Sequence, residues 1–491
     1  MNKKIYVLTT FAALSVGLIS CKKDFLNKLP ISQGTVGNYY KTASDAEGGL
    51  IGAYQQAFLT DQYWVWDYTT NGDARADNCF AGGDNPDNFG IDNFTPTPLN
   101  GNVTRDWQGL YQDIYAANTV IDKVPQIPAT SFSGNRQQEI ISEAKFIRAL
   151  SYFQLVTTYG AVPLVTSTIA GKFQPTPSRT AVTAVYAQIE KDLTDGEGVL
   201  PASFPNVGHA TKGAVQALLA KVYAQEGKYQ QCLDYCNKVI AGPYALVPDY
   251  KTLFDGTKNT TESIFEIQHS DASSFTTYNV SLYLPEIFGT YSFKKFNIPT
   301  NDLTSLFKSQ NDNIRLNASI YTATVDVNGQ AAGDPVPPPY TDKSPTVPFL
   351  YKWKTNISQF GGGTDNTILL RLADIILLKA EALNQLGQTL AAIPLVNQIR
   401  TRVHLPGITV TSKDDVALAI LNERRMELAF EGQRWNDLLR FGSDYTINLM
   451  KAQVDPFGKA LNYGINQNKL IFPVPLNEIQ LDGNLTQNPG Y

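Results

Sequence analysis

Residues 213–240, GAVQALLAKVYAQEGKYQQCLDYCNKVI, decide the fold class of this chain. Apolar residues recur at helical spacing on both sides of Gly227. The first part carries Val215, Leu218, Leu219 and Val222, and the second carries Tyr229, Leu233, Cys236 and Ile240. Because Gly227 permits a tight turn between the two parts, this stretch predicts a helical hairpin.

A second copy of this pattern lies at residues 373–400, ADIILLKAEALNQLGQTLAAIPLVNQIR. Ala380, Leu383, Gly387, Ala392, Val396 and Ile399 fall in step with Ala220, Tyr223, Gly227, Cys232, Cys236 and Val239. An internal period of this kind indicates stacked structural repeats. Small residues at four of these positions let paired helices approach closely, which resembles the tetratricopeptide pattern. We therefore predict a helical scaffold.

The remaining chain divides around these hairpins. Residues 139–156 have the apolar spacing of an amphipathic helix. Residues 242–365 are rich in Pro, Gly, Thr, Asn and Tyr, which predicts long loops with a few strands, such as 263–267. The predicted fold is thus mostly α, a tetratricopeptide-like helical-hairpin scaffold with a loop-rich, partly β face. The expected segments are 1–20, a signal peptide; 21–240; 241–365, a loop-rich insertion; and 366–491.

The N-terminus has the pattern of a lipoprotein signal. Lys3 and Lys4 precede an apolar run from residue 5 to 19 that is too short to span a bilayer stably. Ser20-Cys21 then resembles the site where signal peptidase II cuts and the cysteine receives lipid. We expect acylated Cys21 to be the first mature residue, anchored in a membrane by its acyl chains.

Composition limits the classes of partner that this chain is expected to bind. The formal charge of −5 gives no electrostatic footprint for nucleic acid. The chain holds 24 Phe, 25 Tyr and 5 Trp, more than the predicted helices need for their cores, so some rings are expected to face a ligand.

Two aromatic segments are candidates for that ligand face. The first mixes aromatic and short polar side chains, which suits a sugar, because a pyranose offers an apolar face for stacking and hydroxyls for paired hydrogen bonds. Its candidate residues are Trp64, Trp66, Tyr68, Asn71, Asp73, Arg75 and Asn78. The second segment, around Tyr283, Phe288, Tyr291, Phe293 and Phe296, is expected to face the first. The alternative for both is aromatic packing in the core, beside a solvated acidic loop in the first segment.

Metal binding has weak support in the sequence. Asp73, Asp77, Asp84 and Asp87 lack the spacing of a calcium loop and its terminal Glu, so we expect no cofactor, with Ca²⁺ as the lesser alternative. Cys232 and Cys236 occupy packed positions of the first hairpin and are expected to be core residues.

Residues 422–441 are dense in charge, yet they do not indicate an enzyme. Paired carboxylates serve glycoside hydrolysis only when the pKa of one is raised. Here Glu427 and Glu431 have Arg three or four positions away along a helix, which keeps both ionised and predicts a salt-bridged helical junction. The three histidines fall in no catalytic or metal-binding pattern. We expect a binding protein without catalysis.

Several motifs together resemble the SusD/RagB family of nutrient-binding lipoproteins. They are DFL at 24–26, the stretch 107–118 with Ile121-Asp122, EAKFIRAL at 143–150, YGAVPL at 159–164, LRLAD at 370–374, AEA at 380–382, residues 397–402, ERR at 423–425 with 431–438, and FPVP at 472–475.

The resemblance implies a tetratricopeptide-like scaffold under an irregular binding face, seated over a SusC-like TonB-dependent transporter. It implies lipid anchoring in the outer membrane, facing outward, and an oligosaccharide or polysaccharide as cargo. The alternative cargo is an oligopeptide, as for a RagB-like relative.

Overall fold

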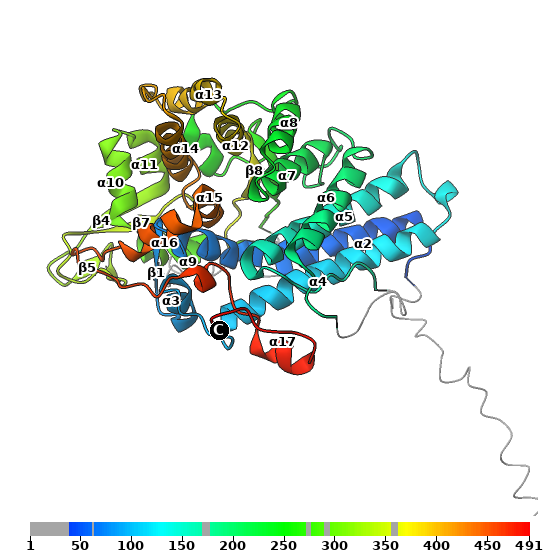
Figure 1. Ribbon diagram of the computed structural model, residues 1–491, viewed down its shortest axis with the longest axis horizontal. Coiled ribbons are helices and arrows are strands. Elements are labelled where there is room, and N and C mark those ends of the chain that lie inside the picture. Colours follow the sequence, from blue (N-terminus) through cyan, green and yellow to red (C-terminus); the bar gives the residue numbers. More distant parts are fainter. Residues whose placement is uncertain (1–38, 61–62, 169–176, 272–275, 289–294, 355–361) are drawn as a thin grey trace, which may run out of the picture.

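The computed structural model describes residues 39–491 except 61–62, 169–176, 272–275, 289–294 and 355–361 (Figure 1). Its helices are α2 (Ala43–Gln55), α3 (Pro86–Asp92), α4 (Gly101–Lys123), α5 (Arg136–Tyr159), α6 (Val182–Glu197), α7 (Lys212–Gln225), α8 (Tyr229–Ile240), α9 (Asn279–Tyr283), α10 (Asn301–Ser309), α11 (Asn313–Ser319), α12 (Leu372–Gln385), α13 (Thr389–Arg402), α14 (Lys413–Glu427), α15 (Arg434–Phe441), α16 (Ser443–Lys451) and α17 (Leu476–Leu481). Predicted signal residues, including Cys21, lie outside the described part.

The two predicted hairpins are confirmed as α7–α8 and α12–α13. Gly227 and Gly387 both end the first helix of their hairpin at positive φ, +72° and +79°. The residue after each glycine donates its backbone N–H to the carbonyl oxygen five residues earlier, Lys228 to Tyr223 and Gln388 to Leu383, at 2.8 Å in both. The same turn chemistry therefore recurs in both copies.

The hairpins stack through α8 and α12. Ala220, Ala380, Cys232 and Ala392 are all fully buried, as the repeat pattern predicts. Cys232 and Cys236 are core residues, with their Sγ atoms 3.9 Å apart.

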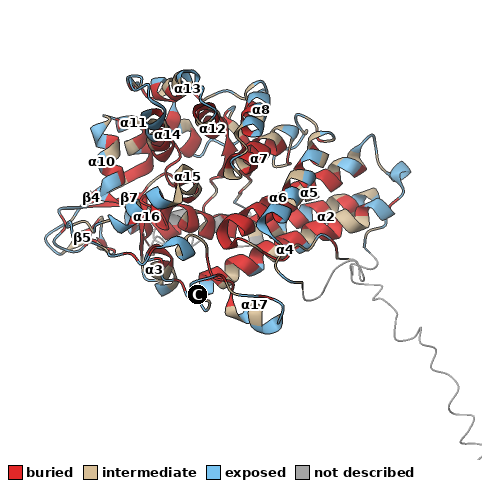
Figure 2. Ribbon diagram, in the orientation of Figure 1, coloured by how far each residue is buried: buried red, intermediate tan, exposed pale blue. Residues whose placement is uncertain are grey.

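The N-terminal helices form a second layer beside the hairpins. Figure 1 shows α2, α4, α5 and α6 running together at one end of the molecule, and α5 packs against α2, α4 and α6. The predicted helix at 139–156 is therefore confirmed and is longer than expected. Figure 2 shows buried surface on the inward sides of these helices and exposed surface on their outward sides. One hydrophobic cluster joins residues of α2 to residues of α14.

Strands are short and paired antiparallel. They are β1 (Cys79–Gly82) with β3 (Phe296–Pro299), β2 (Ser263–Ile267) with β8 (Thr367–Arg371), β4 (Ile320–Thr324) with β7 (Thr346–Leu350), and β5 (Gln330–Ala331) with β6 (Asp334–Pro335). The strand predicted at 263–267 is confirmed as β2. The region 242–365 is more ordered than predicted, because it also holds α9, α10 and α11.

Helix α10 shows why that order was missed. Thr300 accepts a hydrogen bond from the backbone N–H of Leu303 and so caps the helix. Only Leu303, Thr304 and Phe307 are buried along it, too few for a strong periodic signal in a short helix. Tertiary packing, rather than sequence pattern, stabilises this element.

None of the helices in the described part of the chain combines the length and the apolar character needed to cross a bilayer.

Candidate functional site

The aromatic run at the start of the first candidate segment lies in the core. Trp64 is 2% exposed, and Tyr68 is 9% exposed. The rings of Tyr63 and Tyr68 lie 5.0 and 5.2 Å from the Trp64 ring, centroid to centroid. Burial leaves neither Trp64 nor Tyr68 a ring face for a sugar in this structure, as the core alternative expected.

Trp66 is half-buried, but its ring already packs against other side chains. Phe296 stacks on it at 5.5 Å with an angle of 20° between the ring planes, and the guanidinium of Arg105 lies 5.1 Å from its centroid. The pairing of β1 with β3 brings these two segments together. Phe296 of the second aromatic segment thus contacts Trp66 of the first, and this contact is core packing.

The polar residues that follow are also buried, and each binds another part of the chain. Asp73 accepts hydrogen bonds from the backbone N–H of Gly432 at 2.7 Å and of Phe430 at 3.2 Å, and from the Asn78 amide at 2.7 Å. Burial raises the pKa of Asp73 to about 6, although these hydrogen bonds oppose the shift.

Asn71 and Arg75 are engaged in the same way. Asn71 donates to the Asp106 carboxylate at 2.7 Å. The Arg75 guanidinium lies 4.6 Å from the Trp435 ring and 4.1 Å from the Phe472 ring, and burial lowers the pKa of Arg75 to about 10. These side chains hold the chain together instead of facing solvent.

Two arginines from the charge-dense segment complete this arrangement. Arg434 forms a bidentate ion pair with Asp77, at 2.7 and 2.8 Å, and Arg425 donates to Asn78 at 3.0 Å. Burial alone would raise the pKa of Asp77, but Arg425 and Arg434 lower it to about 2. We call Asp73, Asp77, Asn78, Arg425 and Arg434 the buried polar junction.

The predicted residues of the second segment divide between the core and the undescribed chain. Tyr283 is fully buried. Tyr291 and Phe293 lie outside the described residues, so the role of Tyr291 stays a prediction.

The charge-dense helix forms the predicted salt-bridged junction. Glu427 pairs with Arg315, Arg371 and Arg402, all of them buried. Burial favours the neutral acid, but these arginines hold the pKa of Glu427 well below its usual range. Arg371 and Lys352 likewise lower the pKa of Glu431. Neither carboxyl is suited to act as a general acid near neutral pH.

The acidic residues considered for calcium have partners within the chain. Asp73 and Asp77 bind backbone amides and arginines, and Asp87 accepts from the backbone N–H of Gly101 at 3.1 Å. Among the residues that the structure describes, no three His, Cys, Asp or Glu side chains converge as metal ligands.

A partly exposed group of rings lies on the strand pair β4–β7. Phe288 lies 4.9 Å from Tyr321 and 5.2 Å from Tyr351, and the two tyrosines are 5.9 Å apart. Tyr321 is paired with Phe349, two residues before Tyr351, so both tyrosines project from the same face of the ladder. We call Phe288, Tyr321 and Tyr351 the aromatic face.

The rings of the aromatic face are tilted against one another, by 83° for Phe288 and Tyr321 and by 45° for the tyrosines. They rest on a buried cluster and do not cover each other by flat stacking. Lys354 adds a cation 4.8 Å from the Tyr351 ring, and burial lowers the pKa of Lys354. Aromatic surface next to a cation and half exposed to solvent suits a polar ligand with apolar faces.

Only Phe288 of this group was among the predicted aromatic residues. Tyr321 lies in the strand sequence IYTAT, Ile320–Thr324, where alternate side chains point to opposite sides. That alternation was a usable signal for Tyr321. Tyr351 directly follows β7, and its backbone N–H donates to the carbonyl oxygen of Ser319. This pairing joins residues far apart in the chain, so the sequence around Tyr351 does not predict it.

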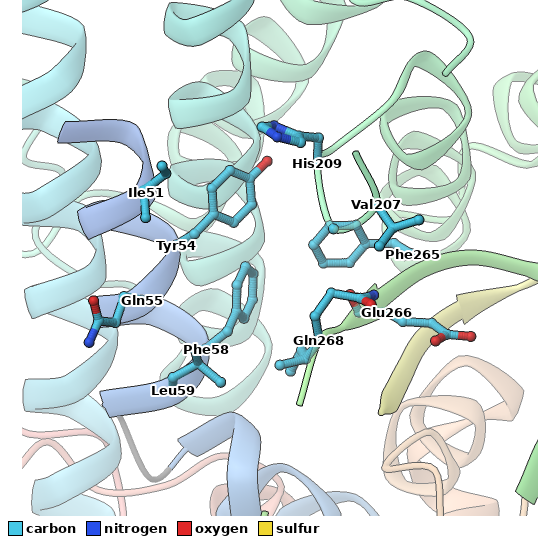
Figure 3. Close-up of a pocket in the computed structure, with 12 residues that line it drawn as sticks. Ile51, Tyr54, Gln55, Phe58, Leu59, Val207, His209, Phe265, Glu266 and Gln268 are labelled. Carbon is cyan, nitrogen blue, oxygen red and sulfur yellow. The ribbon is translucent and has the colours of Figure 1, made fainter. Parts of the chain in front are cut away.

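A separate cleft lies between α2 and β2 (Figure 3). Tyr54 and Phe58 come from the α2 side, Phe265 from β2, and the Tyr54 hydroxyl points toward His209. Tyr54 donates to Glu143 at 2.8 Å, and His209 Nδ1 lies 2.7 Å from the same carboxylate. At about 180 Å³ the cleft is smaller than typical ligand sites, and its polar groups bind one another.

Comparison with known proteins agrees with this fold. A family model described as "SusD family" matches residues 291–491, and one described as "Starch-binding associating with outer membrane" matches residues 32–224. A SusD-like protein of Formosa agariphila is 27% identical, with 99% of this chain and 98% of that protein covered. The starch-binding protein SusD of Bacteroides thetaiotaomicron is 24% identical, with 100% of this chain and 99% of that protein covered.

Among solved structures, a laminarin-binding SusD-like protein is 28% identical and superposes with a TM-score of 0.75, covering 92% of this chain and 100% of that one. The matches extend over the N-terminal helices, the two hairpins and the strands between them. The chain therefore belongs to the SusD-like family.

Proposed function

We propose that this protein captures an oligosaccharide or polysaccharide at the cell surface and passes it to a SusC-like TonB-dependent transporter. The observation that carries the proposal is the aromatic face, where Phe288, Tyr321 and Tyr351 are grouped on one side of β4–β7 and stay partly exposed. Sugar rings stack on such surfaces through their C–H faces, and the tyrosine hydroxyls supply hydrogen bonds.

A β-glucan is the first ligand to test. The solved relative at 28% identity is described as laminarin-binding, and it is covered over its whole length. The starch-binding relative makes an α-glucan the second. These relatives are binding proteins, which supports a role without catalysis, as does the arginine pairing of Glu427 and Glu431.

We further infer that acylated Cys21 anchors the protein in the outer membrane, facing outward. The support is the signal pattern of residues 1–21 and the match to a family described as associating with the outer membrane. More than one acyl chain on a single cysteine gives stable anchoring, because each buried methylene contributes about 0.8 kcal/mol.

The ligand is tested by isothermal titration of the protein lacking residues 1–21 against laminarin, starch, their oligomers and mixed peptides. Tyr321→Ala and Tyr351→Ala are expected to weaken glycan binding, each by about 1–3 kcal/mol if one ring stacks on one sugar, by analogy with base stacking on aromatic side chains. Phe457→Ala is the matched control, since Phe457 is 53% exposed and lies outside the aromatic face.

Each outcome of this titration has a distinct meaning. Binding that Tyr351→Ala weakens and Phe457→Ala leaves intact supports glycan capture at the aromatic face. Heat from peptides alone would replace the proposal with oligopeptide binding. Hydrolysis of a glycan that Glu427→Gln abolishes, with the fold intact, would replace it with an enzyme.

The anchor is tested by labelling cells with a palmitate analogue. Wild-type protein should carry the label in the outer-membrane fraction and co-purify with a TonB-dependent transporter. Cys21→Ser should lose the label and the membrane association; retention of both would refute the lipid anchor.

A further inference from the structure

A wide hollow lies between α2, α4 and α17, a part of the molecule separate from the strands β4 and β7 (Figure 1). Its volume is about 840 Å³, in the upper part of the range of about 300–1,000 Å³ for small-molecule sites. It is larger than the cleft of Figure 3, and no residue of the aromatic face lines it. We call it the α4 hollow.

Aromatic side chains form a graded series along one side of the α4 hollow. Trp107, Tyr111 and Tyr115 are spaced four residues apart on α4, so they lie on one face of the helix. Trp107 is 3% exposed, Tyr111 is half-buried, and Tyr115 is 58% exposed. The three rings therefore run from the core to the solvent-exposed ring of Tyr115.

The inner two rings are held rigidly. The Tyr111 hydroxyl donates to the backbone oxygen of Pro163 at 2.7 Å, and the Trp107 ring lies 5.2 Å from Tyr111 and 5.1 Å from Tyr159. A ligand that stacks on Tyr115 would therefore bind beside two rings that are already fixed in position. Pre-organisation of this kind lowers the entropy cost of binding.

Planar hydrogen-bonding groups surround these rings. Gln108 donates to Glu478 of α17 at 2.8 Å, and Gln56 donates to Gln112 at 3.3 Å. Each of these bonds uses one end of an amide, and both Gln108 and Gln112 are exposed. Amides and a carboxylate beside aromatic rings are the groups that sugar hydroxyls and C–H faces require.

Gly52 keeps the opposite side of the α4 hollow open. It lies within α2, where glycine costs about 0.5–1 kcal/mol relative to alanine. A Cβ added at Gly52 would meet no described atom within 4 Å, whereas one added at Gly48 or Gly49 would lie 2.3 or 2.4 Å from a tyrosine hydroxyl. Packing against a tyrosine explains why Gly48 and Gly49 have no side chain, but it does not explain Gly52. A ligand that passes over the helix at this point would explain it.

We propose that the α4 hollow is a second glycan-binding site, which takes a short oligosaccharide stacked on Tyr115 and hydrogen-bonded by Gln108, Gln112 and Glu478. The choice of a glycan rests on the proposed function of the chain. A second site would give the protein two contacts with one polysaccharide, and the second contact then benefits from a high effective concentration.

The test uses laminarihexaose and isothermal titration of the protein lacking residues 1–21. Tyr351→Ala weakens binding at the aromatic face, and the part of the remaining binding that depends on Tyr115 reports the α4 hollow. Adding Tyr115→Ala is expected to weaken that remaining binding about 5-fold or more, the loss for one stacked ring at about 1 kcal/mol. Adding Phe457→Ala should not change it.

Gly52 supplies an independent pair of variants in the Tyr351→Ala background. Gly52→Leu places a side chain in the α4 hollow and is expected to weaken the remaining binding at least as much as Tyr115→Ala. Gly52→Ala adds only a Cβ and is expected to weaken the remaining binding less than Gly52→Leu does. Both substitutions favour the helix, so melting temperatures at or above that of the parent would exclude unfolding as the cause of a loss.

The outcomes separate this inference from the proposed function. Binding in the wild type that Tyr351→Ala abolishes completely would support the aromatic face and overturn the second site. Remaining binding that neither Tyr115→Ala nor Gly52→Leu weakens would also overturn it. No binding heat from the wild type, with laminarihexaose or with the wider glycan panel, would overturn both the second site and the proposed function.

Discussion

The buried polar junction and the aromatic face come from equally promising sequence, yet only one of them faces solvent. Segment 63–78 has the richer mixture of aromatic, amide and carboxylate groups, and it is bound by Arg425 and Arg434 in the interior. The aromatic face is assembled from Phe288, Tyr321 and Tyr351, far apart in sequence, and keeps exposed ring surface. A mixture of side chains suited to sugars therefore identifies a binding surface only when no other part of the chain already packs on or hydrogen-bonds to those side chains.

The physical difference lies in the partners. A carboxylate buried without a partner is very costly, so Asp73 and Asp77 require donors from elsewhere in the fold. Segment 425–434 supplies those donors as two arginines and two backbone amides. Rings on a strand face need no such partners, and part of their surface can remain free for a ligand.

The largest expected effect is on stability, from Arg434→Ala. This change leaves the buried Asp77 carboxylate without its bidentate partner, and removal of one member of a buried ion pair costs about 3–5 kcal/mol. Urea unfolding should show this loss in the free energy of unfolding, while the folded protein keeps its glycan affinity. Loss of affinity with unchanged stability would mean that the junction, and not the aromatic face, contacts the ligand.

A second effect concerns pH and Asp92, which contacts β1 next to the junction. Asp92 accepts from the backbone N–H of Ala81, and burial raises the pKa of Asp92 to about 7 although Tyr463 and Ala81 donate to it. A raised pKa in the folded state stabilises the protein fully below the unfolded pKa of about 3.9, and this contribution is lost as pH rises through 7. The expected loss is about 1.4 kcal/mol per pH unit between roughly pH 4 and 7.

Thermal or urea unfolding from pH 4 to pH 8 measures this slope. Asp92→Asn cannot titrate, so the difference in stability between wild type and variant should change over that window and level off above pH 7. A constant difference across the whole range would show that Asp92 keeps an ordinary pKa and that its burial has little electrostatic cost.

A smaller effect is expected at the aromatic face itself, from Tyr351→Phe. This variant keeps the ring and loses only the hydroxyl, so glycan binding should weaken by no more than about 0.5–1.5 kcal/mol, the value of one hydrogen bond. Titration against the ligand found for the wild type checks this. If Tyr351→Phe were as damaging as Tyr351→Ala, hydrogen bonding and not stacking would be the main contribution of this residue.

The smallest effect is expected from Lys354→Met. The ammonium lies 4.8 Å from the Tyr351 ring, a contact worth about 0.5–1 kcal/mol at such sites. Glycan affinity should change only a few-fold, and the stability should stay close to that of the wild type. Because the side-chain volume is nearly conserved, a large loss of affinity would show that the cation itself binds the ligand.

Local sequence predicted the scaffold well, for a simple reason. Gly227 and Gly387 each follow a helix whose apolar residues repeat with the helical period, and both the turn and the buried stripe are local properties. The sequence predicted that Glu427 is ionised but not which residues pair with it, because Arg424, one helical turn away, pairs with Asp374 and Asp437 instead. Arg315 and Arg371, which complete the cluster around Glu427, come from distant segments.

The candidate site was predictable only in part. Phe288 belonged to a visible aromatic segment, and Tyr321 to a visible strand, but Tyr351 joins them through the pairing of β4 with β7. Trp64 and Tyr68 looked equally suitable, and nothing within their segment distinguishes a covered ring from an exposed one. Trp64 packs on Tyr63 and Tyr68 of its own segment, whereas Phe296, which covers Trp66, is more than 200 positions away.

By itself, the sequence determined the helical hairpins, their repeat, the negative net charge and the lipoprotein-like signal, because each depends on neighbouring residues or on composition. Only the tertiary structure decided which aromatic rings are exposed, which carboxylates are paired and where hollows such as that beside α4 remain. Burial is a property of the whole fold: the same tryptophan is a ligand platform or a core residue according to what packs on it.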